Sequence, residues 1–142
     1  MRRRDDDRTK DEADVSYYIA KTLPVTLEEA IDLTEAALKK EGFGVLTKID
    51  IASTLKEKIG ADFRPYTILG ACNPKLAYEA LQVEDKVGLM LPCNVIVQDA
   101  GDGRSEVAAI DPVASMQAIE NDDLLKAASE VRAKLERVIA GL

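Results

Sequence analysis

Residues 64–74 read RPYTILGACNP, and this stretch decides where the chain changes from strand to helix. The side chains up to Cys72 are mostly aromatic, β-branched or small, which favours a strand. Asn73 has the side chain of a helix N-cap, and Pro74 suits the first helical position, where its missing N–H has no helical partner. We therefore predict a strand over 64–72 and a short helix directly after it, with apolar positions at Leu76, Ala77, Ala80 and Leu81.

The chain before this stretch predicts two strands and a long helix between them. Residues 15–25 suit a strand that ends beside a proline. Thr26 and Glu29 have the spacing of a capping box, and an apolar stripe with helical periodicity continues from there to Gly42. Residues 45–51 then alternate apolar and polar side chains, which indicates a strand with one face in the core.

A second, shorter helix is predicted between those strands and the opening stretch. Thr54 and Glu57 have the spacing of another capping box, and Gly60 suits the end of the helix. After the opening stretch, residues 88–98 are rich in apolar side chains and predict a further strand.

The last part of the chain predicts a hairpin followed by a long helix. Residues 100–103 read AGDG, a turn sequence that connects the strand before it to a strand at 106–110. Asp122 and Asp123 suit the first turn of a helix because carboxylates stabilise its amino end. One apolar stripe follows, made of Leu124, Leu125, Ala128, Val131, Leu135, Val138 and Ile139.

The order of these elements predicts an α+β fold. Strands and helices do not alternate strictly, which favours a mixed or antiparallel sheet with helices packed mainly on one face. We expect a single compact domain over residues 15–142. Residues 1–14 are almost wholly charged or small and predict a flexible arm.

Charge and composition limit the partners of this protein. The 142 residues carry a formal net charge of -7, so a nucleic-acid backbone is repelled and we expect no nucleic-acid partner. Aromatic residues make up 4%, too few for base-stacking platforms. The sequence has no early apolar segment and no apolar run long enough for a bilayer, which predicts a soluble, cytoplasmic protein without a membrane partner.

Histidine is absent from the sequence, and this absence removes several kinds of site. Ser-His and Cys-His nucleophile pairs, histidine-ligated zinc and histidine-ligated haem cannot come from this chain alone. The two cysteines are predicted to be reduced thiols and not a structural disulfide. Two thiols without histidine are a weak metal signal, so we predict no metal site.

The two cysteines stand in similar Cys-Asn dipeptides and are the most distinctive chemical feature. Cys72 precedes the predicted helix N-cap, where the helix dipole can lower a thiol pKa and create a nucleophile. Cys93 follows Pro92, which marks an edge or bulge position in a strand. The candidate ligand or thiol site is Cys72, Asn73, Cys93 and Asn94.

Simpler interpretations of these residues remain open. Free cysteines are most often buried core residues, and this is the commoner outcome for both thiols. Other polar residues define no site by their spacing and suit exposed strand faces or turns: Asp50, Asp62, Arg64, Tyr66 and Asp111.

Two strings of sequence resemble a known prokaryotic family, domain of unknown function 302 (DUF302). They are YTILGACNP at 66–74 and GLMLPCNV at 88–95, and the capped helix at 26–41 matches the usual opening of the family. The resemblance covers residues 17–114. It implies a compact α+β domain that forms homodimers in bacteria or archaea, with no established reaction. The matching positions are Cys72, Asn73, Pro74, Pro92, Cys93 and Asn94.

Three functional hypotheses follow from the sequence. The leading one is a non-enzymatic module that binds or senses a small molecule, with its site near Cys72 and Cys93. The first alternative is a thiol-dependent enzyme that uses Cys72 as its nucleophile. The second is a purely structural or assembly protein with both cysteines in its core. The sequence identifies no ligand, cofactor or reaction, and whether the chain is an enzyme stays open.

Overall fold

The computed structural model describes residues 16–142, and the arm predicted for residues 1–14 lies outside them. The order of strands and helices agrees with the sequence prediction. In chain order the elements are β1 (Tyr18–Leu23), α1 (Leu27–Lys40), β2 (Gly44–Asp50), α2 (Ile51–Ile59), β3 (Tyr66–Cys72), α3 (Pro74–Val83), the 3-10 helix η2 (Asp85–Met90), β4 (Cys93–Gly101), β5 (Arg104–Ile110), α4 (Pro112–Ser115) and α5 (Asp122–Ala140).

The five strands form one sheet in the order β1-β5-β4-β3-β2, and every neighbouring pair is antiparallel. This arrangement confirms the predicted α+β class. The predicted hairpin joins β4 to β5, where Gly101, Asp102 and Gly103 all have positive φ angles. β1 and β2 are the two edges, so β3 and β4, which carry the two cysteines, lie inside the sheet.

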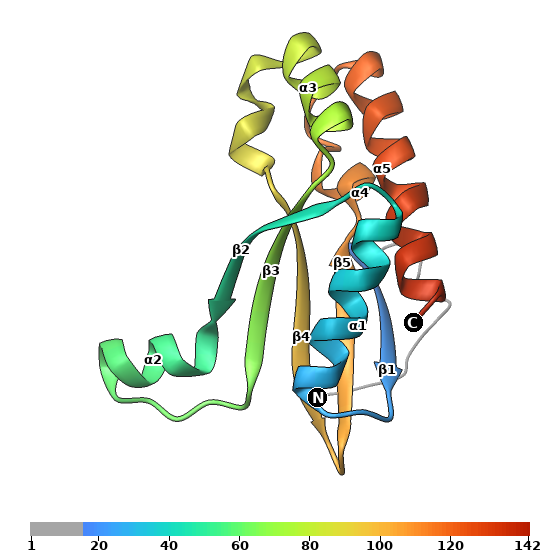
Figure 1. Cartoon of the computed structure of the whole chain (residues 1–142). Helices are drawn as coiled ribbons and strands as arrows, with labels where there is room; N and C mark the ends of the chain where they lie inside the picture. The colour runs from blue at the N-terminus through green and yellow to red at the C-terminus, as the bar shows by residue number, and fades with distance from the viewer. Residues whose placement is uncertain (1–15) are drawn as a thin grey trace.

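Helices α1 and α5 cover one face of the sheet, as Figure 1 shows. The main core lies between them and the strands, and its fully buried members include Leu38, Leu69, Val95, Val107 and Leu135. The capping box predicted at Thr26 and Glu29 is present at the start of α1. Below, the face that these helices cover is called the inner face and the opposite one the outer face.

A second apolar cluster lies beyond the end of the sheet. Figure 1 shows α3, η2 and the first half of α5 extending past the strands there. The cluster is formed by buried side chains of these elements and of the segment around α4, namely Ala80, Val87, Met116, Leu124 and Ala128. The chain therefore has a sheet core and a smaller helical core, which α5 connects because it contributes to both.

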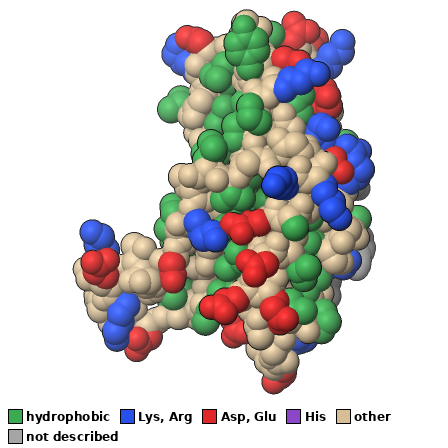
Figure 2. Space-filling view, in the orientation of Figure 1, with side chains coloured by type: hydrophobic (Ala, Val, Ile, Leu, Met, Phe, Trp, Pro, Cys, Tyr) green, Lys and Arg blue, Asp and Glu red, His purple; other side chains and the backbone are tan. Residues whose placement is uncertain are grey.

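The end of β2 and all of α2 project from the body of the molecule (Figures 1 and 2). α2 has no buried side chain, and Leu46 and Ile59 are 66% and 72% exposed. Gly60 ends α2 in the left-handed conformation, as predicted.

Three local predictions were wrong. α2 begins at Ile51 with Asp50 as its N-cap, so Thr54 lies inside the helix and donates its hydroxyl to the Asp50 carbonyl. The strand predicted over 88–98 begins only at Cys93, because residues 85–90 form η2. Pro92 precedes an interior strand and not an edge strand.

The sequence prediction also missed the short helix α4. Asp111 caps it and accepts hydrogen bonds from the backbone N–H groups of Val113 and Ala114. Within residues 16–142, no helix has the length and apolar character needed to cross a membrane.

Candidate functional site

Asn73 connects the end of α1 to the start of α3. Its side-chain oxygen accepts a hydrogen bond from the Leu76 N–H at 3.3 Å, which caps α3 as predicted. Its side-chain nitrogen donates to the Glu41 carbonyl at the end of α1, also at 3.3 Å. Gly42 leaves room for this contact, because a Cβ there would lie 3.1 Å from the Asn73 amide nitrogen. Asn73 therefore fixes where α3 starts relative to α1.

The two cysteines lie close together but in different surroundings. Cys93 pairs across the ladder with Ala71, the residue next to Cys72, so their strands are neighbours. Both thiols are free. Cys93 is buried on the inner face at 7% exposure, whereas Cys72 is half-buried at the end of β3. Neighbouring positions along a strand point to opposite faces, so the two side chains leave β3 and β4 in different directions.

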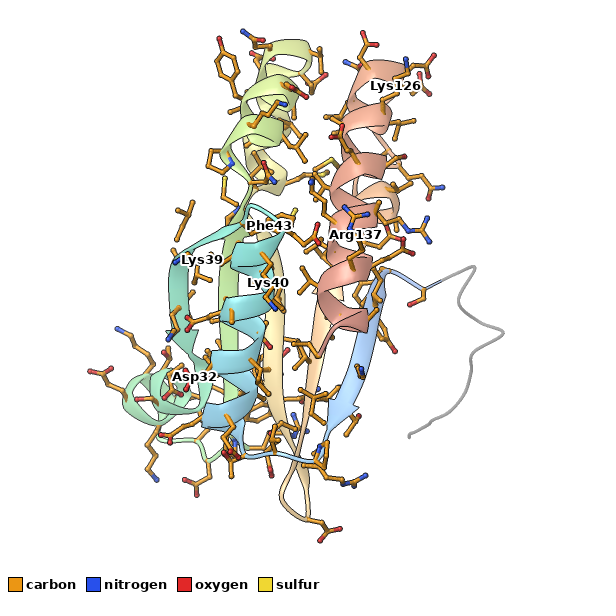
Figure 3. All side chains as sticks on the ribbon, turned by 45° about the vertical axis from the view of Figure 1, so that its right-hand side comes forward. Asp32, Lys39, Lys40, Phe43, Lys126 and Arg137 are labelled. Carbon is orange, nitrogen blue, oxygen red and sulfur yellow. The ribbon has the colours of Figure 1, made fainter. Side chains whose placement is uncertain are left out.

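An apolar crevice lies where the sheet core meets the helical core. Its lining includes Ala71, Cys72 and Cys93 at the ends of β3 and β4, together with residues of α3 and α5. The crevice volume is about 30 Å³, close to the share of one water molecule. Figure 3 labels Phe43, another lining residue, where the end of α1 meets α3 and α5. Most of the lining side chains are small or aliphatic, including Leu76, Ala77, Ala80, Met116, Ala127 and Ala128.

Burial controls the chemistry of Cys93. Its desolvation, followed by the nearby Cys72, raises the pKa of the Cys93 thiol from 9.0 to about 11. The thiolate is the nucleophilic form of cysteine, and a raised pKa keeps it scarce at neutral pH. Cys93 therefore contributes a neutral, apolar surface to the crevice.

Asn94 lies apart from the other three predicted site residues. It is exposed on the outer face, opposite Gly70 in the ladder, and borders a shallow hollow with Tyr18 and Ile96. The structure thus brings Cys72, Asn73 and Cys93 together at one crevice and places Asn94 outside it.

Gly70 permits the close packing that positions the start of β4. A Cβ at this position would lie 2.2 Å from the Thr47 hydroxyl and 2.9 Å from the Pro92 ring. Both side chains therefore pack directly over the β3 backbone. This packing holds Pro92, and with it Cys93, against β3.

The remaining polar candidates serve local roles, although Asp111 is buried and not on an exposed strand face or turn. Asp50 and Asp111 cap helices, and Asp62 pairs with Lys56 at 2.9 Å. In residues 16–142 no three Cys, Asp or Glu side chains lie close enough together to hold a metal ion. Tyr66 lies on the outer face of the sheet. Its partial burial is the main cause that raises the pKa of its hydroxyl.

Sequence reasoning missed a groove beside the crevice. It has a volume of about 480 Å³, and its side chains come from the end of α1, the start of α3 and the middle of α5. Three lysines line it: Lys40, Lys75 and Lys134. They lie far apart in the sequence and form no motif, so no local signal could have identified the groove.

Comparisons with known proteins agree with this architecture. The model of the family described as "Domain of unknown function DUF302" matches residues 19–142. A solved structure titled as an uncharacterized conserved DUF302 protein from Bacillus stearothermophilus has a similar fold, with a TM-score of 0.81 and 29% sequence identity. The match covers 87% of this chain and 96% of that one. Among curated proteins the sequence has no match.

Proposed function

This chain belongs to the DUF302 family, and we propose that it is a non-enzymatic module that binds a small apolar ligand, or the apolar part of a larger one, in the crevice beside Cys93. The observation that carries the proposal is the position of the crevice. It lies on the seam between two apolar clusters, and buried members of both clusters line it.

The chemistry of the lining favours binding over catalysis. The amide of Asn73 is already hydrogen-bonded on both sides, to Leu76 and Glu41, so it offers little to a reacting group. The raised pKa of Cys93 keeps its thiol neutral, which suits contact with an apolar group and does not suit attack on a substrate. These two properties support a binding role for Asn73 and Cys93, whereas the thiol-enzyme alternative depends on Cys72.

Binding requires the seam to widen, because 30 Å³ does not hold an organic ligand. α3 is the wall best suited to move. Only Leu76 and Ala80 are buried in it, and opposite its alanines α5 also presents alanines, Ala127 and Ala128. Each methylene group that enters the seam gains roughly 0.8 kcal/mol from burial, which offsets part of the cost of separating the helices.

A neutral probe tests this proposal without involving charge. We expect hexan-1-ol to shift the NMR signals of the alanine methyl groups along the seam in a saturable manner. Ala77→Leu and Ala127→Leu each place a larger side chain in the crevice lining and should weaken this binding severalfold. Two variants are used because either one alone can perturb packing.

Ala36→Leu provides the matched control, since Ala36 is exposed on α1 away from the crevice. The binding proposal is wrong if hexan-1-ol shifts no seam signals. It is equally wrong if both seam variants bind the alcohol as the control does.

We extend the proposal to a homodimer formed through the outer face. Within residues 16–142 no helix covers this face, and a row of apolar side chains crosses all five strands: Ala20, Ala108, Ile96, Ile68 and Ile49. Beside this row, Gln98 hydrogen-bonds both Arg64 and Glu106, so charges of both signs lie on one surface. A two-fold dimer requires such a self-complementary surface.

Sedimentation equilibrium tests the dimer. Ile96→Lys should convert the protein to monomers, whereas Leu89→Lys, at a residue 87% exposed outside this face, should leave the dimer intact. A monomeric parent protein, or a dimeric Ile96→Lys variant, would contradict this assembly.

A further inference from the structure

The groove lined by Lys40, Lys75 and Lys134 adjoins the apolar crevice, and we propose that the two bind one amphipathic anion. The apolar tail lies in the crevice and the carboxylate or phosphate head lies in the groove. This inference rests on the proposed function, because it specifies the class of ligand for the same crevice. Below, the groove is called the lysine groove.

The lysine groove is positive within an acidic protein. The chain as a whole carries a net charge of -7, yet three lysines from three different helices converge here. Within residues 16–142, none of the three forms an ion pair with a carboxylate. Their charges are therefore available to an anion entering the groove.

The two glutamates in the groove do not cancel this charge. Glu41 is already engaged by Arg137, whose Nε and Nη2 atoms both lie 3.1 Å from its Oε1 atom. With Glu41 paired, Glu130 is the other carboxylate in the groove lining, and the same lining contains three lysines. Figure 3 shows Lys40 on α1 and Arg137 on α5, close to the position of Phe43 at the crevice.

The first turn of α3 connects the lysine groove to the crevice. Asn73 and Leu76 line both, so a molecule that passes them contacts lysines on one side and apolar side chains on the other. Asn73 is held in place by its two hydrogen bonds, which fixes this boundary. The lysine side chains of the groove and the apolar lining of the crevice therefore lie close enough for one small amphipathic acid to contact both.

These features favour a small acid over a nucleic acid or a free anion. The groove is confined to three helix segments, whereas a phosphate backbone needs an extended basic surface, and the overall charge repels it. A free anion would gain nothing from the crevice. Only a ligand with both a charged head and an apolar tail uses both halves of the site.

The test compares three probes, hexanoate, hexan-1-ol and acetate, by NMR titration of the full chain at low ionic strength. Hexanoate should bind about tenfold more tightly than hexan-1-ol, which corresponds to roughly 1.4 kcal/mol. Acetate, which lacks the tail, should bind more weakly than either. Salt should reduce the advantage of hexanoate because it screens exposed charges.

Lysine variants then assign the head group to the groove. The double variant Lys75→Gln and Lys134→Gln should bind hexanoate no better than hexan-1-ol and should leave hexan-1-ol binding unchanged. Lys126→Gln is the control, because Lys126 is an exposed lysine on α5 outside the groove. Hexyl phosphate in place of hexanoate distinguishes a phosphate preference from a carboxylate preference.

Failure of this inference is distinguishable from failure of the proposed function. If hexan-1-ol binds at the seam but hexanoate binds no more tightly, the anionic head is refuted and the apolar site stands. Acetate that binds as tightly as hexanoate would also refute the inference, since the tail would then contribute nothing. If neither six-carbon probe shifts the seam signals, the proposed function itself is refuted.

Discussion

The two Cys-Asn dipeptides share a sequence but have opposite environments. In Cys72-Asn73 the cysteine is half-buried and the asparagine is fixed by two hydrogen bonds. In Cys93-Asn94 the cysteine is buried and the asparagine is exposed on the outer face. The difference arises because the first dipeptide ends a strand and begins a helix, whereas the second begins an interior strand. The chemical role of a Cys-Asn dipeptide therefore depends on its position in the sheet.

The largest expected difference between the dipeptides is at their asparagines. Asn73→Ala should lower the free energy of unfolding by about 2 kcal/mol, because it removes the N-cap of α3 and the bond to the Glu41 carbonyl. Asn73→Asp keeps the capping oxygen but cannot donate to that carbonyl, so about half the loss is expected. Urea denaturation measures both variants, and a loss of less than 0.5 kcal/mol in Asn73→Ala, about the usual scatter for surface substitutions, would contradict the role of this residue.

The cysteines provide the next test. Cys93→Ser buries a hydroxyl in an apolar site and should cost about 1–3 kcal/mol. Cys72→Ser, at a half-buried position, should cost less than 1 kcal/mol. Both variants are compared by chemical denaturation under reducing conditions. Equal losses would show that the two thiols share one environment.

The pKa of Cys93 predicts a specific dependence of stability on pH. The folded-state pKa of about 11 lies above the ordinary value of 9.0, so the folded protein binds this proton more tightly than the unfolded protein does. The stability from the neutral thiol is present below pH 9 and is lost as pH rises toward 11. Relative to Cys93→Ala, the parent protein should lose about 1.4 kcal/mol by pH 10. Parallel pH profiles for the two proteins would exclude this effect.

The smallest effect is expected at Asn94. Asn94→Ala should change the free energy of unfolding by less than about 0.5 kcal/mol, because the side chain is exposed and no hydrogen bond to it occurs within residues 16–142. Urea denaturation under the conditions used for Asn73→Ala gives the direct comparison. A loss as large as that of Asn73→Ala would mean that the outer face has a structural role not described above.

Local signals in the sequence predicted the elements that depend on local interactions. The capping box at Thr26 and Glu29, the Asn73 cap and the 100–103 hairpin all form within a few residues, and each was predicted correctly. The start of α2 was misplaced because two local signals compete there. Asp50 takes the N-cap role, and this leaves the Thr54 hydroxyl to bond within the helix.

The candidate site depends on relations that the sequence does not contain. Burial of Cys93 follows from the interior position of β4, which the strand order decides and no local pattern reveals. The strand predicted over 88–98 was wrong over residues 88–92 for a related reason, since Leu89 is apolar but lies exposed on η2. The lysine groove requires three helices to meet, so it became visible only in the folded chain.

A crystal structure with bound 4-bromobenzoate tests the central claim most directly, because bromine can be located by its anomalous signal. The account predicts bromine in the crevice between α3 and α5, near Ala80 and Ala128, with the carboxylate directed toward Lys75 and Lys134. Bromine on the outer face, or no ordered bromine with the crevice still closed, would contradict it.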